Sequence, residues 1–263
     1  MGGALLAGWR AQGVSSERIY VVESDVARAV AIADAHGVTV ATEPSAVDET
    51  NTADVIVLAV KPQQISLVLP AYAGLAARGA LILSIAAGCT IGGLSRALGG
   101  DVDAAIVRAM PNTPAAIGRG MTVACAGLRV TTDQRRIASD VLAAVGQVAW
   151  VDDEALMDAV TAVSGSGPAY VFLLAECLAE AGVTAGLPAT LAAQLARETV
   201  IGAAALLDAD EAPPETLRTR VTSPGGTTAA ALDVLMGPGG LKPVLNAAVD
   251  AAARRSRELS GGS

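Results

Sequence analysis

Short apolar runs alternate with amphipathic segments from the N-terminus to about residue 151. Several runs are continuously apolar, which is typical of strands buried on both faces of a largely parallel sheet. Between them, residues 25–35 and 132–145 carry apolar residues at helical spacing. The pattern predicts βαβ units and therefore an α/β fold. The runs are "RIYVVES" (18–24), "ADVIVLAV" (53–60), "GALILSIAA" (79–87), "DAAIVRAM" (103–110), "MTVACAGL" (121–128) and "GQVAWVD" (146–152).

The pattern changes near residue 151, where strand-like runs end and long helical segments rich in Ala and Leu begin. Pro168 and Pro188 stand near expected helix starts, where proline is tolerated. We therefore expect two domains, residues 1–151 and residues 152–263, the second of them all-helical. Its helices are apolar around most of their circumference, which favours burial between subunits. Burial inside a monomer is the alternative.

The chain opens with "MGGALLAGWR", a glycine pair followed by apolar residues at helical spacing. This pattern is similar to the start of the first helix of a Rossmann-like dinucleotide-binding domain, where Gly2 and Gly3 would approach a pyrophosphate. That helix normally follows a strand and two earlier glycines, which are missing here. The sequence predicts a Rossmann-like domain that lacks its first strand. We expect the natural protein to begin roughly 10 to 15 residues upstream of Met1, enough for a strand and a turn.

Charge, aromatic content and hydropathy argue against nucleic acid and membranes as partners. The formal net charge is −8, and aromatic residues make up 2% of the chain, so nucleic acid is not an expected partner. The mean hydropathy is +0.49, yet Gly, Ser and Thr interrupt each apolar stretch before it reaches about 20 residues. No basic segment precedes the apolar start. We expect a cytoplasmic protein with neither a membrane span nor a signal peptide.

Cysteine and histidine usage argues against a metal centre. Cys89, Cys125 and Cys177 are far apart in the sequence, which favours reduced, mostly buried thiols over disulfides or a zinc site. The single histidine, His36, precedes Gly37 at an expected helix end, where a cap explains it better than catalysis. We expect no bound metal and no nucleophilic triad.

Candidate cofactor segments follow the expected strands, at the carboxyl edge where open α/β folds bind dinucleotides. Glu23 ends a strand about 20 residues after Gly3, the spacing of the acid that binds the adenosine ribose. Its charge would repel a 2′-phosphate, which favours NADH modestly without excluding NADPH. Pro62 holds Lys61 in a defined turn because it disfavours helical geometry at the preceding residue. The candidate cofactor-binding residues are Gly2, Gly3, Glu23, Ser24, Ala59, Val60, Lys61, Pro62, Ala86, Ala87, Met110, Pro111 and Asn112.

The stretch "VTSPGGTTAAALDVL" (221–235) is the strongest candidate for a substrate site. Pro224 and two glycines predict a tight loop before a helix, whose first amides would bind a carboxylate. An ordinary helix cap made by Ser or Thr is the alternative. The candidate substrate-binding residues are Ser223, Gly225, Gly226, Thr227 and Thr228.

A second small-residue segment, "AVSGSGPAY" (162–170), begins the first long helix of the second domain. Gly165 and Gly167 permit close packing of the backbone against a neighbour. We favour this interpretation over direct contact with a ligand.

Four segments together identify a family. "AVKP", "RAMPN", "AVSGSGPAY" and "VTSPGGTTAAAL", in this order and spacing, resemble those of pyrroline-5-carboxylate reductases, from Met1 to about Arg255. The resemblance implies a Rossmann domain that binds NADPH or NADH and a helical domain that forms an intertwined homodimer, with dimers assembling further. It also implies that 1-pyrroline-5-carboxylate is reduced to L-proline, the last step of proline biosynthesis, with Ser223, Gly226 and Thr227 among its contacts.

The resemblance places the catalytic role on Thr228, whose hydroxyl is expected to hydrogen-bond the ring nitrogen of the imine. The sequence offers no strong acid there, and a substrate bound as an iminium needs none. Two alternatives stay open. A β-hydroxyacid dehydrogenase shares the two-domain layout, but it is expected to use a helix-borne lysine, and none lies between Gly165 and Ala185. The other is a cofactor-binding homologue with impaired catalysis, because the first strand and two glycines are missing.

Overall fold

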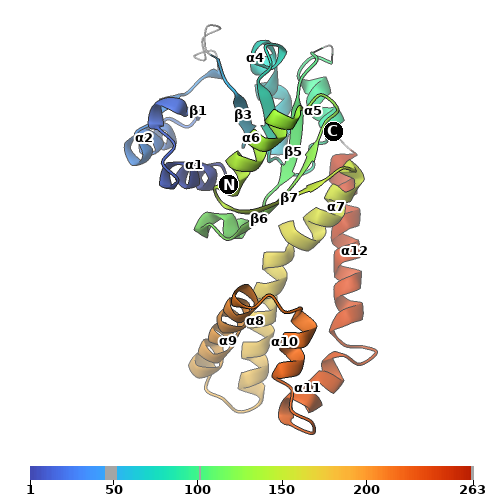
Figure 1. The fold of residues 1–263 in the computed structure, drawn as a ribbon. Helices are drawn as coiled ribbons and strands as arrows, with labels where there is room; N and C mark the ends of the chain where they lie inside the picture. Colours follow the sequence, from blue (N-terminus) through green and yellow to red (C-terminus); the bar gives the residue numbers. More distant parts are fainter. Residues whose placement is uncertain (45–51, 101, 262–263) are drawn as a thin grey trace. The chain divides into compact units, whose positions relative to one another are not determined.

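The computed structural model describes residues 1–44, 52–100 and 102–261. The chain divides into two compact units, Met1–Gly165 with Ala253–Ser263, and Ser166–Ala252. All the strands of the described chain lie in the first unit, and the second is helical (Figure 1). Each unit is described by itself.

Helices and strands alternate in the first unit, and each of the six predicted runs overlaps a strand. The short strand Thr39–Ala41 has no counterpart among those runs, because Thr39 interrupts its apolar residues and leaves no continuous run. The elements are α1 (Gly2–Ala11), β1 (Tyr20–Val22), α2 (Val26–His36), β2 (Thr39–Ala41), β3 (Val55–Leu58), α3 (Ile65–Val68), α4 (Ala73–Ala77), β4 (Leu81–Ser84), α5 (Ile91–Ala97), β5 (Ile106–Met110), β6 (Gly120–Ala126), α6 (Thr132–Ala143), β7 (Gly146–Val151) and α7 (Met157–Val160).

The strands form two sheets, which are not hydrogen-bonded to each other within the described residues. One pairs β1 with β2, and the other has the order β3-β4-β5-β6-β7. All neighbours are parallel except β5 and β6. A doubly wound sheet places its first strand between the strands that correspond to β1 and β3, so the sheets are separate where the sequence predicts a missing strand (Figure 1). Where the natural chain begins stays a prediction.

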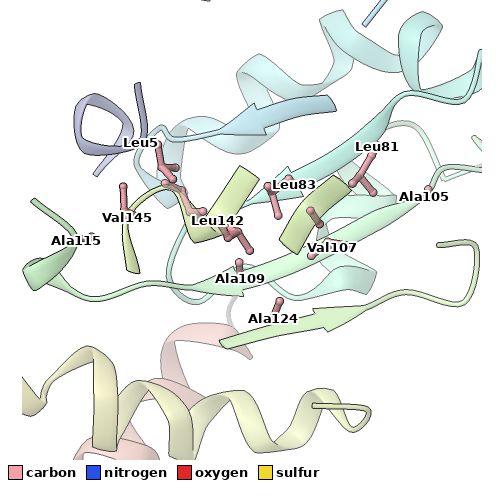
Figure 2. Close-up of a cluster of buried hydrophobic side chains, with 12 residues drawn as sticks. Leu5, Leu81, Leu83, Ala105, Val107, Ala109, Ala115, Ala124, Leu142 and Val145 are labelled. Carbon is pink, nitrogen blue, oxygen red and sulfur yellow. The ribbon is translucent and has the colours of Figure 1, made fainter. Parts of the chain in front are cut away.

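Both faces of the five-stranded sheet are buried, as its continuous apolar runs predict. All four residues of β4 are buried. Leu81 and Leu83 pack with Leu5 of α1 and Leu142 of α6 on one face (Figure 2). Ile82 points to the opposite face, in a cluster with apolar residues of α3 and α5. Removing this apolar surface from water is the main favourable contribution to folding of the unit.

One charged side chain is buried in the sheet. Arg108 of β5 is 5% exposed, and its Nη1 donates to Oε1 of Glu154 at 3.0 Å. The same oxygen accepts the N–H of Ile91, the first residue of α5, at 2.8 Å. A buried charge without a partner is strongly unfavourable, so the stability of this unit depends on Glu154.

Two of the three cysteines are buried in the first unit. Burial is the main cause that raises the pKa of the Cys89 and Cys125 thiols, and the positive charge of Arg108 partly opposes it. Both residues are free thiols, as the sequence predicts, whereas Cys177 of the second unit is an exposed free thiol.

The second unit is built from long helices. No strand follows Val151 in the described chain, so the predicted change of pattern lies where the strands end. The compact units divide later, after Gly165, and the last residues return to the first unit. There the hydroxyl of Ser256 donates to Oδ1 of Asp158 at 2.6 Å. The helices are α8 (Gly167–Thr184), α9 (Ala189–Ala209), α10 (Pro214–Arg220), α11 (Thr227–Leu235) and α12 (Leu241–Ser260), the last of which extends into the first unit.

These helices expose many apolar side chains. Every residue of α8 is described and none is buried; Phe172 and Leu173 are 64% and 56% exposed. By length and composition alone, the helical stretch Glu154–Thr184 could cross a membrane, and 6% of its apolar window is buried inside the chain. A single stretch of this kind is weak evidence for a membrane span, because a helix covered by a protein partner has the same composition.

Candidate cofactor and substrate sites

The carboxyl ends of β3, β4 and β5 lie at one edge of the sheet. In parallel register, Leu58 pairs with Ser84, and Ser84 pairs with Arg108. The candidate segments that follow these strands therefore begin at the same edge, as the sequence predicts. The exposed candidates are Gly3, Ser24, Ala59, Lys61, Pro62 and Ala87, the half-buried ones are Gly2, Glu23, Val60, Met110 and Asn112, and the buried ones are Ala86 and Pro111.

The start of α1 lies against the end of β3. A Cβ on Gly2 would be 2.9 Å from the Cβ of Ala59, whereas Gly3 has no described atom within 4 Å of that position. Among the described residues no side chain caps α1, so its first amides are left for another acceptor. A glycine that lets a helix start approach a strand end, with uncapped amides, fits the pyrophosphate of a dinucleotide.

Glu23 follows β1 and its carboxylate is held in place. Its N–H donates to the carbonyl oxygen of Ala41 at 2.9 Å, and its Oε1 accepts the N–H of Asp25 at 3.0 Å. Asp25 in turn caps α2 by accepting the N–H of Arg28 at 3.0 Å. This hydrogen bond is the main cause that lowers the pKa of Asp25. The guanidinium of Arg28 is 3.6 Å from the Asp25 carboxylate, so a cation lies one turn away from Glu23.

The turn after β3 has the conformation that its proline predicts. Lys61 is extended, with φ −64° and ψ 146°, and Pro62 begins a 3-10 helix. The N–H of Gln64 donates to the carbonyl oxygen of Lys61 at 2.9 Å. Both Lys61 and Pro62 are exposed at the carboxyl edge, where a ligand can reach them.

The carboxamide of Asn112 is used within the protein. Its Oδ1 accepts the N–H of Met121 at 2.8 Å. Its Nδ2 lies 3.3 Å from the carbonyl oxygen of Ser164 and 3.4 Å from its hydroxyl oxygen. Asn112 therefore fixes the segment that contains it, and its contact with a cofactor stays a prediction. Sequence reasoning missed Ser164, although its motif was singled out.

The candidate substrate loop, residues 222–228, forms a tight turn in the second unit. The N–H of Gly226 donates to the carbonyl oxygen of Ser223 at 3.1 Å, and Gly225 has a φ of +68°, in the left-handed region that favours glycine. A Cβ on Gly226 would be 2.5 Å from the Ser223 hydroxyl oxygen. Gly225 is thus needed for the backbone of this turn, and a side chain at Gly226 would displace the Ser223 hydroxyl. The turn leads directly into Thr227 and Thr228.

The helix that follows the turn, α11, begins without a side-chain cap. Gly226 is its N-cap, and no hydrogen bond from a described side chain caps its first turn. An ordinary cap made by Ser or Thr, the alternative from sequence, is therefore not present among the described residues at the start of α11. Thr227 is exposed and Thr228 is half-buried. An uncapped helix start with adjacent hydroxyls suits a small carboxylate ligand.

An ion pair secures the helix that precedes the loop. Nη1 of Arg220, the last residue of α10, lies 2.5 Å from Oδ2 of Asp210. Oδ1 of Asp210 accepts the N–H of Ala212 at 2.8 Å. The hydrogen bond from Ala212, followed by that from Arg220, lowers the pKa of Asp210. The end of α10 is thereby tied to the α9–α10 connection.

Comparison with known proteins identifies the family. Residues 154–259 match a family model described as pyrroline-5-carboxylate reductase dimerisation, and residues 1–88 match one described as NADP oxidoreductase, coenzyme F420-dependent. A pyrroline-5-carboxylate reductase of Synechocystis is 48% identical over 216 residues, which are 82% of this chain and 79% of the relative. The chain belongs to the pyrroline-5-carboxylate reductase family.

Solved structures of pyrroline-5-carboxylate reductases have the same fold. That from Coxiella burnetii is 37% identical with a TM-score of 0.91, covering 98% of this chain and 94% of the other. That from Plasmodium falciparum, solved with NADP bound, is 29% identical with a TM-score of 0.78, covering 99% and 94%. These matches confirm the predicted fold, a Rossmann-like domain followed by a helical one. They also identify the chain as a member of the reductase family, so the β-hydroxyacid dehydrogenase alternative is wrong.

Proposed function

We propose that this chain reduces 1-pyrroline-5-carboxylate to L-proline with NADPH or NADH, as the last step of proline biosynthesis, in the cytoplasm. The observation that carries the proposal is the uncapped start of α11 behind the Ser223–Gly226 turn. In a chain of this family, that feature suits the carboxylate of the substrate. In this proposal residues 1–151 hold the cofactor, and residues 152–263 hold the substrate and the partner subunit.

The test is an assay with purified chain, 1-pyrroline-5-carboxylate, and NADPH or NADH, followed at the nicotinamide absorbance. A fall in absorbance that requires the imine supports the proposal. Cofactor binding without turnover would instead favour the second alternative, a nucleotide-binding homologue that lacks catalysis.

Different residues of the loop bind the carboxylate and the ring nitrogen of the imine. The first amides of α11, from Thr227 onward, hold the carboxylate, assisted by the hydroxyls of Ser223 and Thr227. Thr228 Oγ1 accepts a hydrogen bond from the ring nitrogen when the substrate binds as an iminium. Held at both points, the ring has one orientation, and orientation is a major source of rate enhancement. An already protonated nitrogen needs no acid from the protein.

The edge of the first unit fits a nicotinamide dinucleotide. The start of α1 at Gly2 suits the pyrophosphate, Glu23 and Ser24 suit the adenosine ribose, and residues 59–62 and 86–87 line the edge between them. The segment 110–112, which follows β5, would hold the nicotinamide end. Reduced nicotinamide, when bound, supplies the hydride for C5 of the imine.

Replacing Glu23 by Ser is expected to improve the use of NADPH relative to NADH by about threefold to thirtyfold, from removal of a charge that repels a 2′-phosphate. Arg28, 72% exposed in its side chain, then meets the phosphate without a competing carboxylate at Glu23. The measurement is the ratio of kcat/KM for the two cofactors. Glu17→Ser, which removes the same charge at an exposed position upstream of β1, serves as the control. If both variants keep the wild-type ratio, Glu23 does not contact the ribose.

The second unit supports association of two copies of the chain. Its family model is described as a dimerisation domain, and α8 exposes a continuous series of apolar residues from Val171 to Leu174. A second copy that covers α8 would remove this surface from water, which is the main driving force of association. We propose a homodimer through α8, with further assembly of dimers as the resemblance implies.

Replacing Leu174 by Asp is expected to convert the dimer to a species of one chain mass, 26.1 kDa, because a carboxylate buried between subunits lacks a partner. The measurement is light scattering after size-exclusion chromatography, together with alkylation of Cys177, the exposed thiol of α8. We expect Cys177 to react more slowly in wild type than in the variant. Leu128→Asp, at a fully exposed leucine of the first unit, is the control. Equal masses for Leu174→Asp and wild type would contradict a dimer formed through α8.

A further inference from the structure

The helical segment before α8 contacts the candidate cofactor segment at two adjacent residues. Residues Thr161–Gly165 form a π-helical turn, and π turns are frequent at functional sites. A Cβ on Gly165 would lie 2.5 Å from Cε of Met110 and 3.8 Å from its Cγ. The carbonyl and hydroxyl oxygens of Ser164 both accept hydrogen bonds from Nδ2 of Asn112. Neighbouring residues of this turn therefore hold Met110 and Asn112, on either side of Pro111.

The sequence explains why the carbonyl of Ser164 is available. In an α-helix that carbonyl would accept the N–H of the residue four positions later, which is Pro168. Proline has no N–H, and its ring crowds the carbonyl four residues before it, which disturbs the helix at that point. The Asn112 side chain provides the donor that the helix lacks. The motif "SGSGP" thus has a role that its small residues alone do not reveal.

Asn112 has no freedom to turn its carboxamide away from this arrangement. Oδ1 is bound to the N–H of Met121 at 2.8 Å, at the start of β6, and Nδ2 is bound to Ser164. Rotating the amide would break the hydrogen bonds at both ends and leave their partners unsatisfied. The turn after β5 is therefore fixed from two directions, by β6 and by the π turn.

Resting on the proposed function, we propose that Gly165 and Ser164 are positioning residues for the reductase reaction. The missing side chain of Gly165 leaves room for the Met110 thioether beside the nicotinamide end of the cofactor. Ser164 holds Asn112, so that the backbone of residues 110–112 has a fixed position at the cofactor. Neither residue contacts the cofactor itself. They act through Met110 and Asn112.

The test compares two glycines of one motif. Gly165→Ala places a methyl group 2.5 Å from Met110 Cε, which is too close. We expect the flexible methionine to move aside, so that the protein stays folded. Gly167→Ala meets no described atom within 4 Å and is the matched control. We expect Gly165→Ala to raise the Kd for NADPH, or to lower kcat, by about 10- to 100-fold, the usual effect of a displacement of about 1 Å at a reacting centre. Gly167→Ala keeps both values.

Two readouts separate positioning from general damage. The Kd is measured by fluorescence of bound NADPH, and the Tm is measured without cofactor; we expect the Tm of Gly165→Ala to stay within a few degrees of wild type. Met110→Ala removes the atom that the new methyl would meet. In the Met110→Ala background, Gly165→Ala should therefore change the Kd and kcat by less than about twofold. In the wild-type background it should show the full effect of about 10- to 100-fold.

Each outcome of these experiments supports or overturns the role assigned to Gly165. If wild type neither binds NADPH nor reduces the imine, the proposed function and this inference both fail. If wild type does both and Gly165→Ala matches it in Kd and kcat, the inference alone is wrong. If Gly165→Ala does not fold, the pair of variants carrying Met110→Ala is compared instead, and a double variant that is still unfolded or inactive overturns the role assigned through Met110.

Discussion

Thr228→Ala lowers kcat by about 10- to 1000-fold and leaves the Kd for NADPH near that of wild type. The magnitude is that of losing one hydrogen bond made to the reacting group in the transition state. Thr228 is the second residue of α11, directly behind the tight Ser223–Gly226 turn. In the proposed mechanism its hydroxyl contacts the substrate from a rigid element, and we expect its removal to leave the turn and the cofactor edge unchanged.

The measurement is kcat with saturating NADPH and imine, together with the Kd for NADPH. Thr228→Ser keeps a hydroxyl and should recover most of the activity. Thr219→Ala removes a hydroxyl that is bound to the carbonyl of Glu215 at 2.9 Å in α10, outside the loop, and should have no effect on kcat. A Thr228→Ala enzyme with wild-type kcat would remove Thr228 from the mechanism.

Glu154→Gln is expected to destabilise the protein by about 3 kcal/mol or more, because it leaves the buried guanidinium of Arg108 without a counter-charge. The side chains of Arg108 and Glu154 are 6% and 30% exposed, with 3.0 Å between Nη1 and Oε1. Glutamine keeps an oxygen that can accept the N–H of Ile91. The decrease in the free energy of unfolding therefore reports the loss of the negative charge and not the loss of that hydrogen bond. The measurement is urea unfolding, with a lower midpoint at an unchanged slope.

A solvent-exposed ion pair provides the contrast. Asp103 lies 2.6 Å from Nε of Arg129, and both side chains are about two-thirds exposed, at 67% and 68%. Asp103→Asn should cost less than about 1 kcal/mol, since water screens the pair. Adding Arg108→Met to Glu154→Gln should recover much of the stability by removing the stranded charge. A Glu154→Gln protein as stable as Asp103→Asn would show that Arg108 does not depend on Glu154.

The fold could be predicted where local pattern is sufficient. The run "GALILSIAA" is continuously apolar, and β4 is buried on both faces as such a run requires. The strand β2 was missed because Thr39 interrupts its apolar residues, so no continuous apolar run marks it. The return of α12 to the first unit, through Ser256 and Asp158, joins residues 98 positions apart, and nothing in either segment alone predicts it.

The candidate site shows the same division. Pro62 fixes the turn at Lys61, and the two glycines fix the Ser223–Gly226 turn, because each acts on its own neighbours in the chain. The role of Asn112 was different. The sequence placed it at the carboxyl edge, but the engagement of its carboxamide with Met121 and Ser164 required the tertiary structure.

The sequence by itself determined the alternation of buried strands and helices, the order of the motifs along the carboxyl edge, and the glycine turn before α11. Residues adjacent in the chain decide these features, through backbone geometry and the period of apolar positions. Only the tertiary structure decided that Glu154 neutralises Arg108 across 46 residues and that Ser164 holds Asn112 across 52. Such contacts depend on which segments the packed sheet brings together, and the pairing of a buried charge or amide with its partner has no period in the sequence.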